Sequence, residues 1–314
     1  MKSPIITLGG SLLLAGTLFL ATRPAPLAEK IEKEKEPAPS VSAAKILSKL
    51  LRENKDLVLP ASSTKFPTIL VPKNEREDAT VPLRMSRVKM DIKVTGNIAT
   101  TTLDITYCNE LDRILDGQFC FPLGEGQSIS YFALDMDGKL RESSVVEKAK
   151  GRQTYESVIR KKVDPALLEW TAGNNFKARV YPIPAKGCKR VIVGFEQELI
   201  ATGKSYVYFQ PLQFENKLEE FSFHAEVLNQ TASPQQIDEN GIPLKFENKS
   251  ENWVTEKTYS NYNGNDPIAF EIPANGIARN VFEEQNENGK TVFYANLFPR
   301  KYKAEKKTVS GICV

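Results

Sequence analysis

From Val88 onward, apolar and polar residues alternate with a period of two, and this alternation constrains the fold more than any other feature of the sequence. Every second residue from Val88 to Val94 is apolar. Gly96-Asn97 interrupts the run, and a second alternating run follows over residues 98–105. Successive side chains of a strand point to opposite faces, so the pattern predicts two strands, each with one buried face. The Gly-Asn step predicts a hairpin turn between them.

The same alternation returns along most of the chain, with Gly, Pro and Asp-Gly steps between the runs. Further strands are predicted over residues 117–123, 128–136, 176–183 and 189–199. Strand-like patterns also occur after residue 205, in YVYFQPL, EFSFHAEVL, PLKFENK, WVTEKTY and PIAFEIP, and then in TVFYANLFP. The predicted fold is therefore mainly β. It comprises an antiparallel β-sandwich over residues 88–200 and a β-rich part over residues 201–300, which either continues that sandwich or adds a second one.

Two helices are predicted beside the strands. The stretch SSVVEKAKGRQTYESVIRKK contains few helix breakers, and it predicts one helix near residues 147–162 that covers the sheet. The stretch VSAAKILSKLLRENKDL, residues 41–57, keeps its apolar residues at helical spacing and predicts a short amphipathic helix that packs on the body of the protein. Binding of this helix to a membrane surface is the alternative, although its polar face is mixed rather than basic.

Residues 5–21, IITLGGSLLLAGTLFLA, are uncharged and almost wholly apolar after Lys2. They predict a hydrophobic helix within residues 1–23, either a signal peptide or a signal anchor, that attaches the chain to a membrane. Phe19 breaks the small-residue pattern for cleavage after Ala21, which favours an uncleaved anchor. Basic residues after the segment favour a cytoplasmic chain, but a large folded domain is translocated regardless. We expect the chain to face the periplasm or the cell exterior.

Residues 24–87 are predicted to form a tether that includes the short amphipathic helix. Residues 24–40 consist largely of Ala, Pro, Glu and Lys, with the charge run EKIEKEKE, and they bury too little apolar area to offset the entropy of ordering. Residues 60–87 carry four prolines and predict an extended connector. These prolines are Pro60, Pro67, Pro72 and Pro82.

The charge balance bears on the class of partner. Lys and Arg number 42 against 39 Asp and Glu, which gives a formal net charge of +3, and the two signs are interspersed. Nucleic-acid binding favours a surface patch of one sign. The sequence therefore predicts protein partners or cell-surface components, and no nucleic acid.

The cysteines and the single histidine do not predict a metal site. The four cysteines, at positions 108, 120, 188 and 313, match no metal-ligand spacing. Cys108 and Cys120 flank a predicted hairpin, so a disulfide between them is one interpretation, and buried free thiols in adjacent strands are the favoured one. His224 lies in an alternating run and is interpreted as a half-exposed strand residue.

Candidate acid–base pairs exist, but a structural interpretation of them is favoured. Asp135 with Asp137, and Glu196 with Glu198, are two residues apart on predicted strands and so share a face, which is typical of a solvated strand surface. The sequence contains no Gly-x-Ser-x-Gly elbow, and GEGQS at 124–128 has no Lys for a phosphate loop. No catalytic, cofactor-binding or metal-ligating residue is predicted, and the chain is not expected to be an enzyme. Two glycosylation acceptor motifs occur, at Asn229-Gln-Thr231 and Asn248-Lys-Ser250.

The region from about Val88 to Leu199 resembles the vault protein inter-alpha-trypsin (VIT) domain. Its segments occur in the family's order: VTGNIATTTLDITYCNEL, GQFCFPLGEGQSISYFALDMDGK, EKAKGRQTYE, PALLEW and NNFKARVYPIPAKGCKRVIVGFEQEL. The motifs of the resemblance are Phe121-Pro122-Leu123, Asp137-Gly138, Glu147-Lys148 with Tyr155, Leu167-Leu168-Glu169 and Ile183-Pro184. Gly151 stands within the predicted helix where the family usually has Ala, which weakens that helix.

The resemblance implies a modular protein. VIT domains typically precede a von Willebrand factor type A domain, and TVSGICV resembles the first strand of one. Residues 301–314 are therefore expected to begin such a domain, truncated before the Asp-x-Ser-x-Ser loop that binds Mg²⁺. Mg²⁺ or Ca²⁺ would belong to that missing domain, and no cofactor is expected in this chain. The layout also resembles the bacterial VIT proteins that accompany exosortase N sorting systems.

These expectations combine into one functional hypothesis and one alternative. The hypothesis is a non-enzymatic, membrane-anchored, extracytoplasmic scaffold or adhesion module that mediates protein–protein interaction and is linked to an exosortase-type surface sorting system. The alternative is a hydrolase or transferase of cell-surface polymers built on a β-sandwich.

Overall fold

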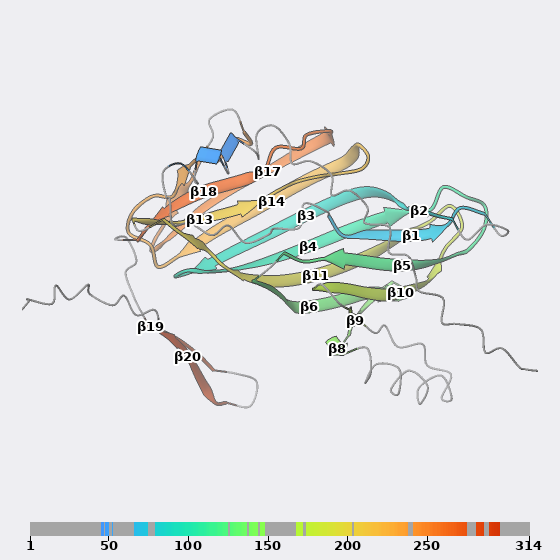
Figure 1. Ribbon diagram of the computed structural model, residues 1–314, viewed down its shortest axis with the longest axis horizontal. Coiled ribbons are helices and arrows are strands. Elements are labelled where there is room, and N and C mark those ends of the chain that lie inside the picture. Colours follow the sequence, from blue (N-terminus) through green and yellow to red (C-terminus); the bar gives the residue numbers. More distant parts are fainter. Residues whose placement is uncertain are drawn as a thin grey trace, which may run out of the picture. The chain divides into compact units, whose positions relative to one another are not determined.

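The computed structural model describes fourteen stretches of the chain, and its strands lie within them (Figure 1). The stretches are residues 45–46, 48–49, 52, 66–74, 79–124, 126–136, 138–143, 145–147, 168–171, 174–202, 204–237, 241–274, 281–285 and 289–295. The described chain is mainly β, as predicted, with several sheets.

The largest sheet has eight strands and contains residues from both predicted β-rich parts. Its strands, in spatial order, are β16 (Glu247–Lys249), β17 (Asn252–Tyr262), β14 (Leu218–Leu228), β3 (Arg84–Thr95), β4 (Ile98–Cys108), β11 (Cys188–Glu198), β6 (Gln127–Met136) and β7 (Lys139–Glu142). Neighbours are antiparallel except β14 and β3, which run parallel. Residues 218–262 thus extend the sheet that residues 84–198 begin.

Two smaller sheets and a hairpin complete the described strands. The six-stranded sheet has the order β2 (Thr80–Pro82), β1 (Thr68–Pro72), β5 (Leu115–Pro122), β10 (Asn175–Ile183), β9 (Leu168–Thr171) and β8 (Val145–Glu147), in which β8 and β9 are parallel. The four-stranded sheet has the order β12 (Ile200–Ala201), β13 (Ser205–Gln210), β18 (Ile268–Pro273) and β15 (Gln235–Gln236). The hairpin pairs β19 (Val281–Gln285) with β20 (Thr291–Ala295).

The two smaller sheets cover the same face of the eight-stranded sheet. On β4, Tyr107 donates a 2.7 Å hydrogen bond to the carbonyl oxygen of Pro67, next to β1. On the same strand, the Thr101 hydroxyl lies 3.0 Å from the hydroxyl of Tyr208 on β13. Residues 101 and 107 are an even number apart, so their side chains share a face. One hydrophobic core therefore lies between the large sheet and both smaller ones.

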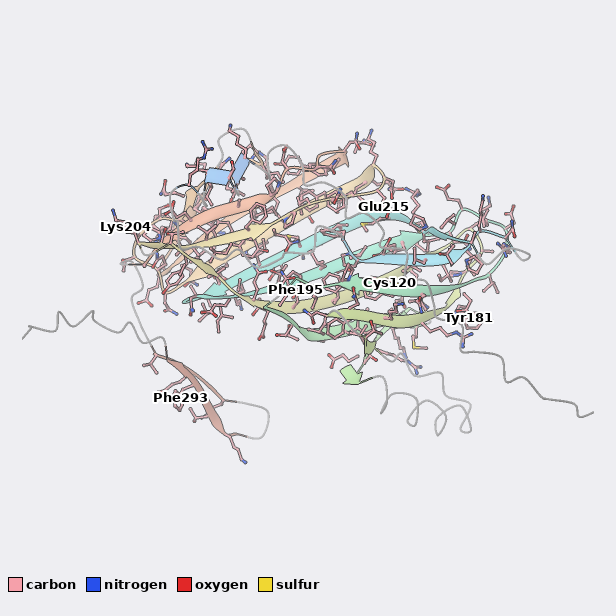
Figure 2. The ribbon with its side chains drawn as sticks, in the orientation of Figure 1. Cys120, Tyr181, Phe195, Lys204, Glu215 and Phe293 are labelled. Atoms are coloured by element: carbon pink, nitrogen blue, oxygen red, sulfur yellow. A yellow bond between two sulfur atoms is a disulfide. The ribbon has the colours of Figure 1, made fainter. Side chains whose placement is uncertain are left out.

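Aromatic side chains fill much of this core. Phe195 of β11, which is labelled in Figure 2, lies in this core. Its ring packs edge-on against that of Phe121 of β5, with ring centroids 5.7 Å apart. Phe132 of β6 packs against Phe119 of β5 at 5.4 Å. Aromatic pairs at these separations stabilise a core beyond the contribution of their buried area. The predicted sandwich of two facing layers is present, and its inner faces are those given by the alternation.

Glycines at two-residue turns close two hairpins. Gly96 has a φ of 63°, and it joins β3 to β4 where Thr95 pairs with Ile98. Gly138 has a φ of 77°, and it joins β6 to β7 where Met136 pairs with Lys139. Positive φ values fit the twist of two-residue hairpins, and glycine adopts them without a steric penalty. Both turns agree with the prediction from Gly96-Asn97 and Asp137-Gly138.

The predicted helices fall largely outside the described residues. This holds for the hydrophobic helix within residues 1–23 and for residues 148–162 of the covering helix, while Glu147 is the last residue of β8. Within residues 41–57, the described residues 45–46, 48–49 and 52 are helical. Ile46 is buried there in a small cluster with Val207 and Phe209. Among the helical residues that the structure describes, no helix has the length and apolar character needed to cross a membrane.

Part of the predicted tether belongs to the six-stranded sheet. Residues 68–72 and 80–82 form β1 and β2 within the segment interpreted as an extended connector. Ile69 and Val71 are buried in the core, which explains why this segment pairs rather than remaining in solvent. The prolines of β1 and β2 are the last residues of their strands, and β2 is an edge strand, where a missing N–H donor is tolerated.

Candidate functional site

A disulfide joins Cys108 at the end of β4 to Cys188 at the start of β11. The two residues face each other in the antiparallel register, and the next pair is hydrogen-bonded from Asn109 N to Gly187 O at 2.8 Å. Cys108 and Cys188 therefore occupy a non-hydrogen-bonded position, where side chains approach closely, and their Cα atoms are 4.0 Å apart. Both interpretations of Cys108 from the sequence were wrong. Cys120 on β5 is a free, partly buried thiol (Figure 2).

A β-bulge beside the disulfide places two arginines on one face of the sheet. In the β3–β4 register, Met85 pairs with Tyr107 and Arg87 pairs with Thr106, so Ser86 is an extra residue. In a regular strand, residues 84 and 87 would point to opposite faces. The extra residue shifts the alternation, and both arginines then line the same cleft as the disulfide.

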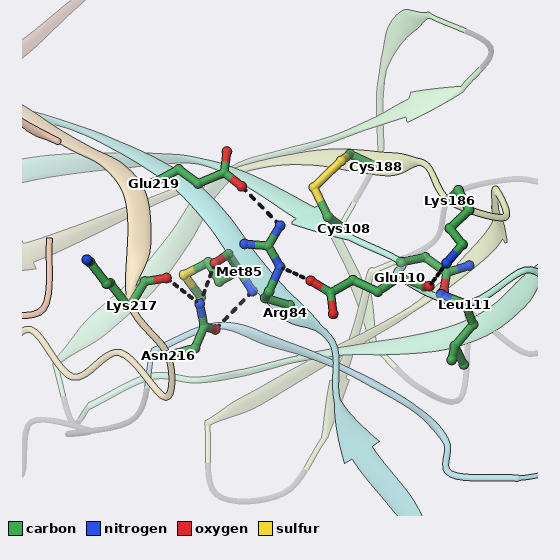
Figure 3. A network of polar contacts seen from close by, with 11 residues as sticks. Arg84, Met85, Cys108, Glu110, Leu111, Lys186, Cys188, Asn216, Lys217 and Glu219 are labelled. Carbon is green, nitrogen blue, oxygen red and sulfur yellow. Dashed lines mark hydrogen bonds and ion pairs between the residues drawn. A yellow bond between two sulfur atoms is a disulfide. The ribbon is translucent and has the colours of Figure 1, made fainter. Parts of the chain in front are cut away.

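The cleft has a volume of about 570 Å³ and lies on the side of the eight-stranded sheet that faces away from the core. Figure 3 shows the disulfide beside Arg84, with Glu219 and Glu110 on either side of the guanidinium. The residues that line the cleft are Arg84, Ser86, Arg87, Thr106, Cys108, Asn109, Glu110, Lys186, Gly187, Cys188 and Glu219. They come from β3, β4, β11 and β14 and from the loops that flank them.

Arg84 connects two carboxylates across the cleft. Its Nε lies 2.7 Å from Glu110 Oε1, and its Nη2 donates to Glu219 Oε1 at 3.0 Å (Figure 3). Hydrogen bonding from Arg84 is the largest cause that lowers the pKa of Glu219, followed by hydrogen bonding from Ser86. Glu219 therefore remains ionised at neutral pH and holds Arg84 beside the disulfide.

Asparagine side chains fix the loops around the cleft. Asn109 is buried, and its Nδ2 donates to the carbonyl oxygens of Arg113 and Pro184 at 2.8 and 2.9 Å. On the opposite side, Asn216 accepts from Met85 N at 3.1 Å and donates to Met85 O at 2.7 Å (Figure 3). Such bonds replace backbone pairing where the ladder ends. These hydrogen bonds to the backbone therefore fix the loops on both sides of the cleft.

The chemistry of the cleft combines a disulfide with charged side chains of both signs. Arg84, Arg87 and Lys186 are cationic and Glu110 and Glu219 are anionic, while Lys186 also lies 3.6 Å from Asp112 Oδ1 beside the cleft. The two cysteine residues differ in exposure, because Cys188 is exposed and Cys108 is only 8% exposed. Nearby cations stabilise a thiolate and so favour thiol–disulfide chemistry.

The titratable residues singled out from the sequence do not line this cleft. His224 lies half-buried on β14, with its Nδ1 3.1 Å from Asp91 Oδ2 on β3. Glu196 and Glu198 are exposed on β11, and Glu198 accepts a 2.9 Å hydrogen bond from Asn97.

The other residues singled out from the sequence are a pair of aspartates and two glycosylation motifs. Asp135 lies partly buried on β6, and Asp137 is outside the described residues. Of the glycosylation motifs, Asn248 is exposed on β16 and Asn229 is partly buried.

In the described ranges, no group of three or more His, Cys, Asp and Glu side chains is arranged to hold a metal ion.

The cleft was not predicted from the sequence. Its residues are scattered from position 84 to position 219, so no motif brings them together. One weak signal existed, namely the placement of Cys108 and Cys188 at the two ends of predicted strands. The bulge at Ser86, which brings Arg84 and Arg87 to one face, has no sequence signature in this chain.

Residues 85–195 match the family model of the vault protein inter-alpha-trypsin domain. The match runs from β3 to β11 and so includes Cys108, Cys188 and the bulge at Ser86, whereas Glu219 lies beyond it. Residues 218–262 of the same sheet are likewise outside the match. The comparison with curated proteins found no match.

Solved structures are similar at low identity. A Legionella pneumophila protein proposed to bind nutrients is 10% identical over 66% of this chain and 69% of its own length, with a TM-score of 0.42. An M1 zinc metallopeptidase from Deinococcus radiodurans is 10% identical, with a TM-score of 0.33. That similarity covers 72% of this chain and spans 50% of the metallopeptidase. At these TM-scores, neither similarity supports a functional argument.

Proposed function

We propose that the chain is a membrane-anchored, extracytoplasmic module that binds protein partners or cell-surface components. The observation that carries the proposal is the Cys108–Cys188 disulfide. Disulfides persist in oxidising compartments such as the periplasm and the cell surface, whereas cytoplasmic thiols are kept reduced. This supports translocation of the β body and favours that orientation over the one given by the basic residues after the hydrophobic segment.

The anchor in this proposal is the apolar segment at residues 5–21. An uncleaved segment of this kind would hold the β body beside the membrane, separated from it by the charged and proline-rich stretch that follows. This arrangement suits a module that presents a binding surface at a short distance from the bilayer.

The outward face of the eight-stranded sheet supports a protein partner. Lys89 and Asp104 are cross-strand partners on this face, and Arg190 donates to Asp104 from the next strand at 2.8 Å. Charges of opposite sign alternate across these strands. A surface of mixed sign is suited to a partner with a complementary pattern, while nucleic acid requires a surface of one sign.

Two narrower features belong to the same proposal. We place the module in an exosortase-type surface sorting system, on the strength of the VIT match and the order of hydrophobic segment, tether and β body. Residues 308–314, TVSGICV, are proposed as the first strand of a von Willebrand factor type A domain, which would supply the Mg²⁺ or Ca²⁺ site. An Asp-x-Ser-x-Ser motif encoded directly after residue 314 would support this assignment, and an unrelated sequence there would contradict it.

Site-specific photo-crosslinking in cells tests the binding role. A photoreactive residue replaces Thr102, which lies on the outward face of β4, and a matched variant carries it at Lys139, which is exposed on β7 at the sheet edge. The proposal predicts a discrete protein adduct from position 102 that is weaker or missing from position 139. Equal labelling from both positions would contradict a specific surface.

An activity assay separates this proposal from the enzymatic alternative. The purified full chain is incubated with cell-wall glycans and peptides, and the products are analysed by mass spectrometry. The proposal predicts that these polymers remain intact, while turnover that grows with protein concentration would favour a hydrolase or transferase.

A further inference from the structure

We propose that the Cys108–Cys188 disulfide is a thiol–disulfide exchange site, at which a low-molecular-weight thiol that carries carboxylates attacks Sγ of Cys188. This inference does not depend on the binding role proposed above. It depends on the exposure of the two cysteines, on the charged side chains around them and on the β4–β11 ladder.

Access selects the sulfur that is attacked. Both cysteines line the cleft, but Cys188 is exposed while Cys108 is 8% exposed. Exchange requires a thiolate to approach the attacked sulfur, so we place the attack at the more exposed cysteine. Cys188 then carries the mixed disulfide, and Cys108 is the leaving group.

Arg84 favours departure of that leaving group. It is the direct partner of Cys108 in the β3–β4 register, and its guanidinium is held in the cleft by Glu110 and Glu219. A cation beside a cysteine stabilises the thiolate, and a thiolate of lower basicity leaves faster. Arg84 is therefore proposed as a positioning residue for the Cys108 thiolate.

Arg87 selects the class of thiol. It lines the cleft and is exposed, and it forms no hydrogen bond or ion pair among the described residues. Its guanidinium is thus available to bind a carboxylate in a bidentate manner. A tripeptide thiol such as glutathione has carboxylates for this contact, whereas 2-mercaptoethanol has none.

The reaction balances without a further reactant. The thiolate sulfur of the small molecule forms a bond to Cys188 Sγ, the Cys188–Cys108 bond breaks, and the electron pair leaves on Cys108 Sγ, which then takes a proton from solvent. A second small thiol, or Cys108 in the reverse direction, releases the adduct. Two electrons pass from two small thiols to the protein when reduction goes to completion.

The β ladder allows this exchange in the folded protein. The disulfide lies at one end of the β4–β11 pairing, which continues from Cys188 and Cys108 to Glu198 and Ile98. Opening the disulfide leaves the rest of this ladder paired. Exchange is therefore expected without global unfolding.

Native-state exchange with defined thiols tests the inference. The full chain, in detergent and with Cys120→Ser and Cys313→Ser, is treated with millimolar reduced glutathione, quenched with acid and mapped by mass spectrometry. We expect glutathione on Cys188, a free thiol on Cys108, and a rate well above that of global unfolding measured on the same protein. An adduct on Cys108, no adduct, or a rate equal to that of unfolding would each overturn the proposal.

Charge variants separate the two arginines. Arg84→Gln is expected to slow exchange several-fold with both glutathione and 2-mercaptoethanol, and Arg84→Lys to restore most of the rate. Arg87→Gln is expected to slow exchange with glutathione alone. Arg179→Gln, which removes an exposed arginine paired with Asp116 on another sheet, is the control and keeps the parent rate. Circular dichroism checks that each variant is folded, and equal rates for all folded variants would contradict the roles of Arg84 and Arg87.

Discussion

The hydroxyl of Tyr208 lies 3.0 Å from the hydroxyl of Thr101, and both groups are buried in the core. Thr101 belongs to β4, within the region that matches the VIT family model, whereas Tyr208 belongs to β13, outside it. This contact therefore connects the matched region to the strands that follow it. Because both parts share one core, we expect them to unfold together rather than as separate domains.

A double-mutant cycle on this pair measures the connection. Tyr208→Phe leaves the Thr101 hydroxyl without its partner, which is expected to lower the free energy of unfolding by about 1–3 kcal/mol. Thr101→Val combined with Tyr208→Phe is expected to be less destabilising than the sum of the single changes, because no unpaired hydroxyl remains. Urea unfolding followed by tryptophan fluorescence checks this, and strict additivity would show that the two hydroxyls do not interact.

Alkaline pH is expected to destabilise the protein through Tyr107 and Tyr208. Burial raises the pKa of both phenols above the ordinary value of about 10. Below the pKa of tyrosine in the unfolded chain, both phenols contribute fully to stability. This contribution is lost as the pH rises toward the pKa that the phenols have in the folded protein, because the unfolded state releases these protons first. In titrations followed by ultraviolet absorbance, these two tyrosines should ionise only on unfolding. Tyr208→Phe should weaken the fall in stability above pH of about 10, and an unchanged pH profile would contradict this assignment.

Gly117 on β5 is expected to tolerate no side chain. A Cβ atom at this position would lie 2.6 Å from Ile69 Cγ2 and 2.9 Å from Ile183 Cδ1. Gly117→Ala therefore overpacks the core and is expected to lower the free energy of unfolding by about 1–3 kcal/mol. Thermal unfolding by circular dichroism measures it, with Gly126→Ala as a comparison, where strain from a φ of 77° acts without any clash. Unchanged stability of the Gly117 variant would mean that β1 and β5 are packed differently.

Removing the Cys108–Cys188 disulfide is expected to lower stability while preserving the fold. The bridge spans 80 residues of sequence, and such a cross-link stabilises mainly by restricting the unfolded chain. Cys108→Ser with Cys188→Ser is expected to lower the free energy of unfolding by about 2–4 kcal/mol, whereas Cys120→Ser should have a much smaller effect. Urea denaturation of the three proteins compares them, and equal midpoints would show that the cross-link does not restrict the unfolded state.

The strands were predictable from the sequence because each depends on local alternation. β3, β4, β5, β6, β10 and β11 lie where the apolar period of two placed them. β1 and β2 were interpreted as a connector, since Pro67, Pro72 and Pro82 masked the buried Ile69 and Val71. The parallel pairing of β14 with β3 could not be predicted, because strand order depends on contacts between residues more than 100 positions apart.

The candidate site was beyond prediction for a related reason. Cys108 and Cys188 become neighbours only through the β4–β11 register, which one sequence does not specify. The bulge at Ser86 then determines that Arg84 and Arg87 share a face, and no turn residue marks it. The local sequence pattern was enough to predict the strands. The cleft, in contrast, depends on the register between β4 and β11 and on the single extra residue in β3.

The redox state of the two strand-end cysteines inside living cells tests the central claim most directly. Cells that express the full chain are quenched with acid, free thiols are alkylated, and peptides containing residues 108 and 188 are identified by mass spectrometry. If the β body is extracytoplasmic, these peptides are recovered joined by a disulfide, while a variant without residues 5–21 yields them alkylated. Recovery of both cysteines as alkylated thiols from the full chain would contradict an extracytoplasmic location.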